Sequence, residues 1–478
     1  MIGITAFGAY VPIYRMSQGE LGRAWRKGGG KGERAVANMD EDSITMGVNA
    51  ALDCIADRNP ERIDGIYFAS TTSPFREKQA SPIIAMAANM RRDVFSADFG
   101  ESLRAGSAAL RAAIDSVKAG SAKTTLVVAS DIRMGEPKSE YEQAFGDGAA
   151  AIMVGESDDA AATIEGIYSH TDEIYDNWRL AGDVNVKSWE DRFVILKGYL
   201  ANMVEAARGI LKKYGMEMKD FSKVVYYAPD GRRHRDLAKE LSLEAEQIQD
   251  PMSDTMGNTG CAYGLMMLVA ALEDAKPGDK ILFLNYGGGA DAFVIQATDK
   301  IEKGRGRRGI KQLLASKMPL PNYETYVRFR EMMPVELTRR PAVVSSAVGL
   351  WRDRKWILGA NASKCKKCGY LQFPVQRVCL KCQSKDEYDY VPISDWPGKL
   401  FTFSKDVLVL SPDPPVILSV VNLEKDGQVV RFYSRMTDRD PDNISVGMPV
   451  EMTFRKMHDG GGYPNYFWKV MPVRQGGS

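Results

Sequence analysis

The sequence has 478 residues, 44% of them hydrophobic and 26% charged, which is ordinary for a globular protein of two to four domains. The formal net charge of +1 argues against binding to nucleic acid or to an anionic membrane surface. No apolar run approaches the ~20 residues of a membrane helix, and the first residues lack the features of a signal peptide. Four of the six cysteines are clustered at metal-ligand spacing, so we expect a cytoplasmic protein with a metal site rather than disulfides.

The first half of the chain is organised around one stretch, Asp98–Asp131. Its pattern predicts a loop, an almost wholly apolar helix that begins at Leu103 and stops at Gly120, and then a buried strand. Such a helix belongs in the interior, and its N-terminus favours chemistry because free N–H groups point there. The other predicted elements are strands at Ile2–Tyr10, Ile63–Ala69 and Phe145–Gly155 and helices at Asp42–Asp57 and Pro82–Met90.

The second half of the chain repeats the order of the first. A shift of 158 positions places Gly106–Gly120 on Gly264–Gly278, and an apolar strand follows each segment. Two such units, each with one buried helix, predict a layered α/β fold with two sheets packed around those helices. The halves are about 1–158 and 159–300, and we expect a pocket where they meet. The other predicted elements are a long amphipathic helix at Phe193–Tyr214, a strand at Val224–Ala228 and a helix at Arg232–Leu241.

Five motifs within residues 1–300 carry a family resemblance. They are RAGSAAL, FGDGAAAIMVG, YYAPDGRR, GNTGCAYG and NYGGGADAF, which start at Arg104, Phe145, Tyr226, Gly257 and Asn285. In this order they resemble the thiolase superfamily, and in particular its 3-hydroxy-3-methylglutaryl-CoA synthase branch. The resemblance implies a duplicated thiolase-like α/β fold that acts on coenzyme A thioesters and pairs as a homodimer through a sheet edge.

Active members of this branch use a cysteine that carries the acyl group, a histidine that orients the second thioester, and a glutamate that acts as acid and base. In this sequence the matching positions hold Leu103, Tyr227 and Thr71, whereas the asparagine of the Gly-Asn motif is retained as Asn258. Leucine cannot be acylated, so we do not expect the usual condensation through an acyl-cysteine. Ser102 neighbours the changed cysteine position. We expect Thr71, Ser102 and Leu103 to border the substrate.

Three hypotheses fit these changes. In the first, the protein is an enzyme that makes or breaks a carbon–carbon bond of an acyl-CoA by aldol or retro-aldol chemistry, without a covalent acyl intermediate. Tyr227 would exchange the β-hydroxyl proton, and Asn258 with backbone N–H groups would bind the thioester oxygen. In the second, the chain is a non-catalytic acyl-CoA-binding scaffold that pairs with an active thiolase-like or acyl-CoA enzyme subunit. An acyltransferase with a different nucleophile is a third hypothesis.

Three residues have both a structural and a functional interpretation. Cys261 is the repeat mate of Leu103, and it is either a buried packing residue or a relocated nucleophile. Arg232 either binds CoA phosphates or lies on a solvated helix face. Tyr227 is either a catalytic group or a packed ring with a satisfied hydroxyl. We expect His234, on the helix of Arg232, to be exposed.

A second module follows a basic linker and helical segment at 301–355. Residues 356–392 contain two Cys-x2-Cys pairs, and four thiolates at this spacing predict a structural zinc ribbon. These ligands are Cys365, Cys368, Cys379 and Cys382. Five short strands within 393–478 predict an OB-type barrel. They are Lys399–Val409, Val416–Asn422, Val429–Arg435, Pro449–Phe454 and Tyr466–Val473. The pair resembles an accessory module of acyl-CoA enzymes, including steroid side-chain aldolases that are similar in lacking the thiolase nucleophile. Nucleic-acid binding is the alternative for such a barrel.

Overall fold

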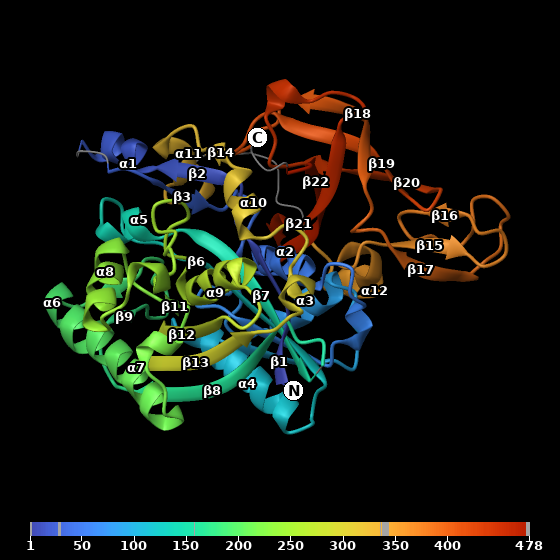
Figure 1. Cartoon of the computed structure of the whole chain (residues 1–478). Helices are drawn as coiled ribbons and strands as arrows, with labels where there is room; N and C mark the ends of the chain where they lie inside the picture. Colours follow the sequence, from blue (N-terminus) through green and yellow to red (C-terminus); the bar gives the residue numbers. More distant parts are fainter. Residues whose placement is uncertain (1, 27–29, 157, 335, 337–343, 475–478) are drawn as a thin grey trace.

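The largest element of the protein is a nine-stranded sheet with the order β11-β12-β13-β8-β1-β7-β6-β4-β5. The computed structural model describes residues 2–26, 30–156, 158–334, 336 and 344–474, and Figure 1 shows the arrangement. The first half of the chain contributes β1 (Ile2–Tyr10), β4 (Gly65–Ala69), β5 (Phe95–Phe99), β6 (Thr124–Ile132) and β7 (Asp147–Glu156). The second half contributes β8 (Ala162–Thr171), β11 (Lys223–Tyr226), β12 (Lys280–Tyr286) and β13 (Gly289–Ala297).

The two halves join where β1 pairs with β8 over two residue pairs, which include Gly3 opposite Thr163. We expected two separate sheets, and the structure corrects this by linking them through a short ladder. The close approach of β1 to β8 depends on Gly3, because a Cβ at this position would lie 2.2 Å from the carbonyl oxygen of Ala162. Strands β4, β5 and β6 run parallel, so their carboxyl ends share one edge of the sheet, where α/β proteins usually bind ligands.

Two buried helices pack against the sheet, as the repeat predicts. They are α4 (Ala105–Lys118) and α9 (Tyr263–Asp274). Helix α4 packs on β4, β6 and β7, helix α9 packs on β7, β11 and β12, and the two helices contact each other. Their first residues are 158 positions apart, which confirms the repeat. Helix α4 begins two residues later than predicted, with Arg104 at its N-cap, so Leu103 lies in the turn before the helix.

Further helices cover the sheet. On the first half lie α2 (Ser43–Ile55) and α3 (Ser81–Ala87), and on the second half lie α7 (Ala201–Tyr214) and α8 (Gly231–Glu240). The predicted helix Phe193–Tyr214 is present, but its first part, Val194–Leu200, is a π-helix that continues from α6 (Asp191–Phe193). His234 on α8 is buried and stacks on Tyr226, so its expected exposure was wrong. Its side chain lies on the face of α8 that packs inward.

Smaller elements complete this part of the chain. A three-stranded sheet contains β2 (Tyr14–Ser17), β3 (Glu33–Val36) and β14 (Met318–Pro319), and a hairpin contains β9 (Asn177–Trp178) and β10 (Lys187–Ser188). The short helices are α1 (Gln18–Trp25), α5 (Glu140–Ala144), α10 (Ile310–Ala315) and α11 (Tyr323–Phe329). The 3₁₀ turns are η1 (Pro60–Arg62), η3 (Met218–Asp220), η4 (Ala245–Gln247), η5 (Gly260–Ala262) and η6 (Ile301–Gly304). Residues 335 and 337–343 of the predicted linker and helical segment lie outside the described residues.

The C-terminal part begins with α12 (Ala347–Ile357) and a small sheet of β15 (Asn361–Cys365), β16 (Leu371–Gln372) and β17 (Tyr388–Pro392). A closed barrel follows, with the strand order β18-β19-β20-β22-β21. Its strands are β18 (Gly398–Asp406), β19 (Val416–Lys425), β20 (Gln428–Met436), β21 (Pro449–Gly460) and β22 (Tyr463–Pro472), with the turn η7 (Pro441–Asn443) between β20 and β21. The five predicted strands are therefore confirmed. Within the described part of the chain, no helix is long and apolar enough to cross a bilayer.

The barrel docks on the α/β part through buried charges, which we call the interface cluster: Asp40, Glu41, Asp438, Arg455 and Lys469. Arg455 on β21 is fully buried and pairs with Glu41 and, at 2.5 Å, with Asp438. Lys469 on β22 pairs with Asp40 at 2.7 Å. The Arg455–Glu41 and Lys469–Asp40 pairs cross from the barrel strands to the residues just before α2, so the two parts form one packed unit (Figure 1).

Candidate active site

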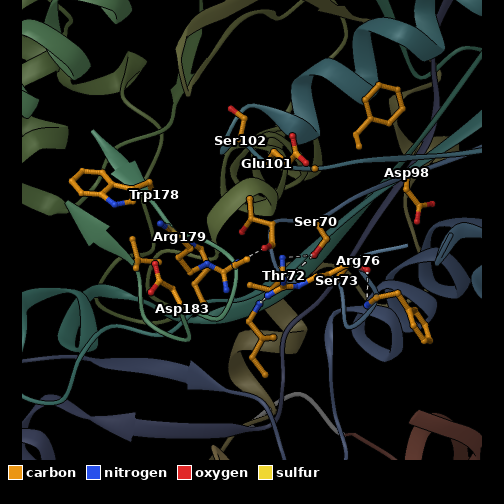
Figure 2. A pocket seen from close by; sticks show the side chains of 18 of the residues that line it. Ser70, Thr72, Ser73, Arg76, Asp98, Glu101, Ser102, Trp178, Arg179 and Asp183 are labelled. Atoms are coloured by element: carbon orange, nitrogen blue, oxygen red, sulfur yellow. Dashed lines mark hydrogen bonds between the residues drawn. The ribbon is translucent and has the colours of Figure 1, made fainter. Parts of the chain in front are cut away.

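A cavity of about 1020 Å³ opens at the carboxyl ends of the parallel strands. Its walls are the segments that follow β4, β5 and β6, together with the β9–β10 hairpin. In Figure 2, Glu101 and Ser102 lie on one side of this cavity, Trp178, Arg179 and Asp183 lie on a second side, and Ser70 and Thr72 lie between them. Loops from both halves of the chain therefore enclose it, where the repeat predicts a pocket.

Asp131 is the central polar residue at this edge. Its buried carboxylate accepts hydrogen bonds from Ser70 Oγ at 3.1 Å and from Thr72 Oγ1 at 2.9 Å. Thr71 donates to it from its backbone N–H at 2.7 Å and from Oγ1 at 2.9 Å, and the N–H of Cys261 donates at 2.8 Å. Five donors saturate this carboxylate, which ties the loop after β4 to the turn before α9. Sequence reasoning missed Asp131, although an acidic residue at the end of a buried strand was a usable signal.

Gly260 makes this junction possible. It has a φ of +64°, and a Cβ at this position would lie 2.3 Å from Asp131 Oδ2 and 2.7 Å from Arg133 Cδ. Only glycine combines a left-handed backbone with such a close approach. The second glycine of the Gly257-x-x-Gly260 motif, in the second half of the chain, therefore lets this turn pack closely against the end of β6 in the first half.

Three of the predicted substrate-binding residues line the cavity: Thr71, Ser102 and Leu103. Leu103 is 7% exposed and belongs to the apolar core that contains α4 and α9. Ser102 accepts a hydrogen bond from the N–H of Arg104 at 3.1 Å and donates to the carbonyl of Gly287 at 3.4 Å. Its hydroxyl is thus used in the turn before the helix, and Leu103 forms an inert part of the cavity wall.

The side chains of Tyr227 and Asn258 are in direct contact, as the prediction that both belong to one site requires. The side-chain amide of Asn258 donates to the Tyr227 hydroxyl at 3.0 Å and to the carbonyls of Ala228 and Pro229 at 3.3 Å. Burial raises the pKa of Tyr227, while the charge of Arg133 and the bond from Asn258 act in the opposite direction. The phenol is therefore protonated at neutral pH. Neither residue is among those that line the cavity, but Arg133 both lines it and acts on Tyr227.

Cys261 lies beneath Asp131 and is fully buried. Its thiol donates to the carbonyl of Ala69 at 3.5 Å. Burial and the neighbouring Asp131 raise the pKa of this thiol well above its usual value, whereas a nucleophilic cysteine needs a lowered pKa and access to substrate. The geometry favours the packing interpretation of Cys261.

Three arginines that sequence reasoning did not single out line the cavity, Arg76, Arg133 and Arg179, whereas the predicted Arg232 does not. Arg133 is 5% exposed, and its guanidinium lies 4.2 Å above the ring of Phe145. Arg179 is half-buried and donates to the carbonyl of Thr71. Burial and the charge of Arg133 lower the pKa of Arg179, and Asp131 opposes this shift. Arg232 is exposed near the start of α8, in agreement with the solvated-face interpretation.

The four clustered cysteines are brought together by the loops around β15 and β16. All four Sγ atoms lie within 4.8 Å of one another, and Cys365–Cys382 and Cys368–Cys379 are 3.6 and 3.5 Å apart. A tetrahedral zinc with Zn–S bonds of about 2.3 Å places its sulfurs about 3.8 Å apart. The donor set and its size fit such an ion.

Comparisons with known proteins agree with this geometry. The family profile described as 3-oxoacyl-[acyl-carrier-protein (ACP)] synthase III matches residues 99–173, and its C-terminal counterpart matches residues 211–296. A solved structure of HMG-CoA synthase complexed with CoA superimposes with a TM-score of 0.64 at 18% identity, covering 72% of this chain and 94% of that one. 3-Oxoacyl-[acyl-carrier-protein] synthase III from Aquifex aeolicus gives a TM-score of 0.56 at 22% identity, covering 62% of this chain and all of the other. These structures share the fold of the α/β part.

Relatives found by sequence identify the family more narrowly than the solved structures do. The hydroxymethylglutaryl-CoA synthase of Pyrobaculum arsenaticum is 33% identical over 346 residues, which cover 70% of this chain and 98% of the relative. The corresponding protein of Archaeoglobus fulgidus is 35% identical over 315 residues, which cover 63% of this chain and 91% of the relative. Nearly the whole length of these proteins is matched. The chain therefore belongs to the hydroxymethylglutaryl-CoA synthase family, within the thiolase-like branch.

Proposed function

We propose that this protein acts on acyl-CoA thioesters and makes or breaks a carbon–carbon bond by aldol or retro-aldol chemistry, without a covalent acyl-cysteine. One observation carries the proposal. The cavity wall holds Leu103 where the family resemblance places the nucleophile, and the nearby Cys261 is buried with a raised thiol pKa. Relatives named for a CoA thioester reaction support the substrate class.

Tyr227 and Asn258 supply the proposed proton chemistry. In the condensation direction, the phenol of Tyr227 donates its proton to the carbonyl oxygen of the acceptor and takes up the proton that the α-carbon of the acyl-CoA loses as the new carbon–carbon bond forms. In cleavage, the Tyr227 hydroxyl accepts the β-hydroxyl proton and passes its own proton to the α-carbon, which receives the electrons of the breaking carbon–carbon bond. This requires the reacting carbons to lie beside Arg133, the cavity residue whose charge acts on the Tyr227 hydroxyl.

Incubation of the purified protein with β-hydroxyacyl-CoAs tests this mechanism. We expect a carbonyl product with a shorter acyl-CoA, and no acyl adduct in the mass spectrum of the intact protein. Tyr227→Phe should lower the rate about a hundredfold. Tyr226→Phe is the matched control, because Tyr226 precedes it on β11 and bonds to His234 instead. An acyl adduct would instead favour an acyltransferase with another nucleophile, and an undiminished rate for Tyr227→Phe would remove its role.

The same changes at the site also suit a non-catalytic scaffold that binds acyl-CoA and completes an active thiolase-like partner. Tight binding to such a partner, with no turnover of any acyl-CoA, would favour that function. We further propose that the four cysteines hold a structural zinc in a ribbon, and that the barrel is of the OB type. A homodimer through β5 is the proposed assembly, since β5 ends the sheet and exposes 64% of Phe95.

A further inference from the structure

Three strands of the barrel, β18, β19 and β20, lie on its side away from the α/β part (Figure 1). The other two strands form the docked side, since β21 packs on α2 and Lys469 of β22 pairs with Asp40. Burial alternates along β20, so Arg431, Tyr433 and Arg435 point to solvent. Together with outward residues of β18 and β19 they form a surface that we call the outer barrel face. Its members are Lys399, Phe401, Val420, Arg431, Tyr433 and Arg435.

Two aromatic rings on the outer barrel face are exposed. Tyr433 is 62% exposed and Phe401 is 46% exposed. The pairing of β18 with β19 shifts between Leu400 and Thr402, so Phe401 is an extra residue that a β-bulge adds to the strand. Thr402 and Tyr433 both pair with Val420, which places the two rings on either side of β19. Each ring leaves apolar area in water that a flat ligand can cover.

Three cations surround these rings. Arg431 and Arg435 flank Tyr433 on β20, each two residues away and therefore about 7 Å along the strand. Lys399 lies across from Arg431, because both residues pair with Asn422 of β19. The guanidinium of Arg431 lies 3.9 Å above the ring of Phe401, and its Nε donates to Asn422 Oδ1 at 3.1 Å. No carboxylate of the described residues forms an ion pair with any of the three cations.

Acidic residues are confined to the two ends of this face. The central residues of its strands, 399–405, 416–423 and 429–436, contain no aspartate or glutamate. Asp406 ends β18 and accepts two backbone N–H groups of the loop that follows, and Glu424 lies near the end of β19. The overall net charge of +1 therefore hides a local positive surface, which favours a ligand with several negative charges.

We infer that the outer barrel face binds single-stranded nucleic acid, a function beyond the proposed acyl-CoA chemistry. Unpaired bases stack on its two rings, and the phosphates between them lie against its three cations. The cations on β20 stand about 7 Å apart on each side of Tyr433, which suits an extended strand with one base between successive phosphates. A duplex keeps its bases covered and leaves the rings unused.

Fluorescence anisotropy of a labelled single strand, titrated with the full-length protein, tests this inference. A 16-nucleotide uridine or thymidine oligomer covers the usual site of a single barrel. We expect a Kd of about 10 μM or lower at 50 mM NaCl, and three phosphate contacts should weaken binding about twentyfold at 200 mM. Undetectable binding, equal affinity for a duplex of the same length, or displacement by an equal concentration of CoA would each overturn the inference.

Two variants locate the binding surface. Tyr433→Ala should weaken binding about tenfold or more by removing one stacking ring, and Arg435→Gln should reduce the slope of log affinity against log salt by about 0.7. Both side chains are exposed, so the unfolding temperature should stay unchanged. The matched controls are Tyr175→Ala, 72% exposed on the α/β part, and Arg111→Gln, exposed on α4.

An anionic membrane is the competing ligand, because the loop Val407–Leu410 beside this face is exposed and apolar. Vesicles of phosphatidylserine and phosphatidylcholine, sedimented with the protein, distinguish the two. We expect the protein to stay in the supernatant. Binding to these vesicles without binding to the oligomer, or an oligomer affinity that neither Tyr433→Ala nor Arg435→Gln changes, would contradict the assignment of this face to nucleic acid.

Discussion

Replacement of Arg455 by methionine tests how the barrel is held on the α/β part. The interface cluster contains three carboxylates and two cations, and Arg455 contacts Glu41, Asp438 and the hydroxyl of Tyr10, the last at 3.0 Å. Arg455, Glu41 and Asp438 are all fully buried. Lys469 bonds to Asp40 and does not replace the lost guanidinium.

The expected loss is about 3–5 kcal/mol of unfolding free energy, the usual cost of removing one partner of a buried ion pair. Burial already raises the pKa of Glu41, even beside Arg455, and without the arginine this pKa rises further. The folded variant therefore binds protons that the unfolded chain releases, so its stability should fall as pH rises towards neutrality. Chemical denaturation at pH 5 and pH 7.5, followed by circular dichroism, measures both effects.

A charge-matched variant controls for the loss of packing. Arg455→Met combined with Glu41→Gln and Asp438→Asn removes the two carboxylates together with the cation, and it should recover most of the lost stability. A loss below about 1 kcal/mol for the single variant, or a combined variant no more stable than the single one, would refute the view that these charges hold the barrel in place.

Two further predictions concern the metal site and a buried acid. A strong chelator or Cys379→Ser should remove one zinc ion per chain and lower the unfolding temperature, whereas Cys54→Ser, outside the cluster, should leave the zinc content measured by mass spectrometry unchanged. Burial raises the pKa of Glu273 to about 7 from 4.5, so the folded carboxyl binds a proton that the unfolded one has lost. Its contribution to stability, up to about 3 kcal/mol, is present below pH 4.5 and lost as pH rises through 7. Glu273→Gln should therefore unfold with a weaker pH dependence in urea titrations, and the same slope for both proteins would contradict the assignment. Glu205→Gln, at an exposed position of α7, is the control.

Local patterns in the sequence were sufficient for much of the fold. The repeat predicted that α4 and α9 begin 158 positions apart, because apolar spacing and the glycine stops are encoded within each segment. The two Cys-x-x-Cys pairs predicted a four-thiol cluster for the same reason. Alternation of apolar residues located the five barrel strands, including β21 (Pro449–Gly460) and β22 (Tyr463–Pro472).

The features that could not be predicted from the sequence depend on contacts between segments that are distant in the chain. The join between β1 and β8 needs two short backbone pairings, which leave no periodic signal. His234 is buried because its face of α8 meets the sheet, although its neighbours on the helix are charged. Arg133 and Arg179 come from a strand end and a hairpin 46 positions apart in the chain, so only the fold shows that they share a cavity.

The barrel is also connected to the cavity. A series of hydrogen bonds runs from the barrel to Asp131, the polar centre of the cavity edge. Tyr466 of the barrel donates to Asp42, the N-cap residue of α2, at 2.7 Å. The hydroxyl of Ser43, the first residue of α2, donates to the carbonyl of Thr72 at 3.0 Å, and Thr72 in turn donates to Asp131 at 2.9 Å. The loop that lines the cavity thus rests on the helix end that the barrel fixes. Three hydrogen bonds along α2 and the loop after β4 therefore connect the docked barrel to the polar centre of the cavity.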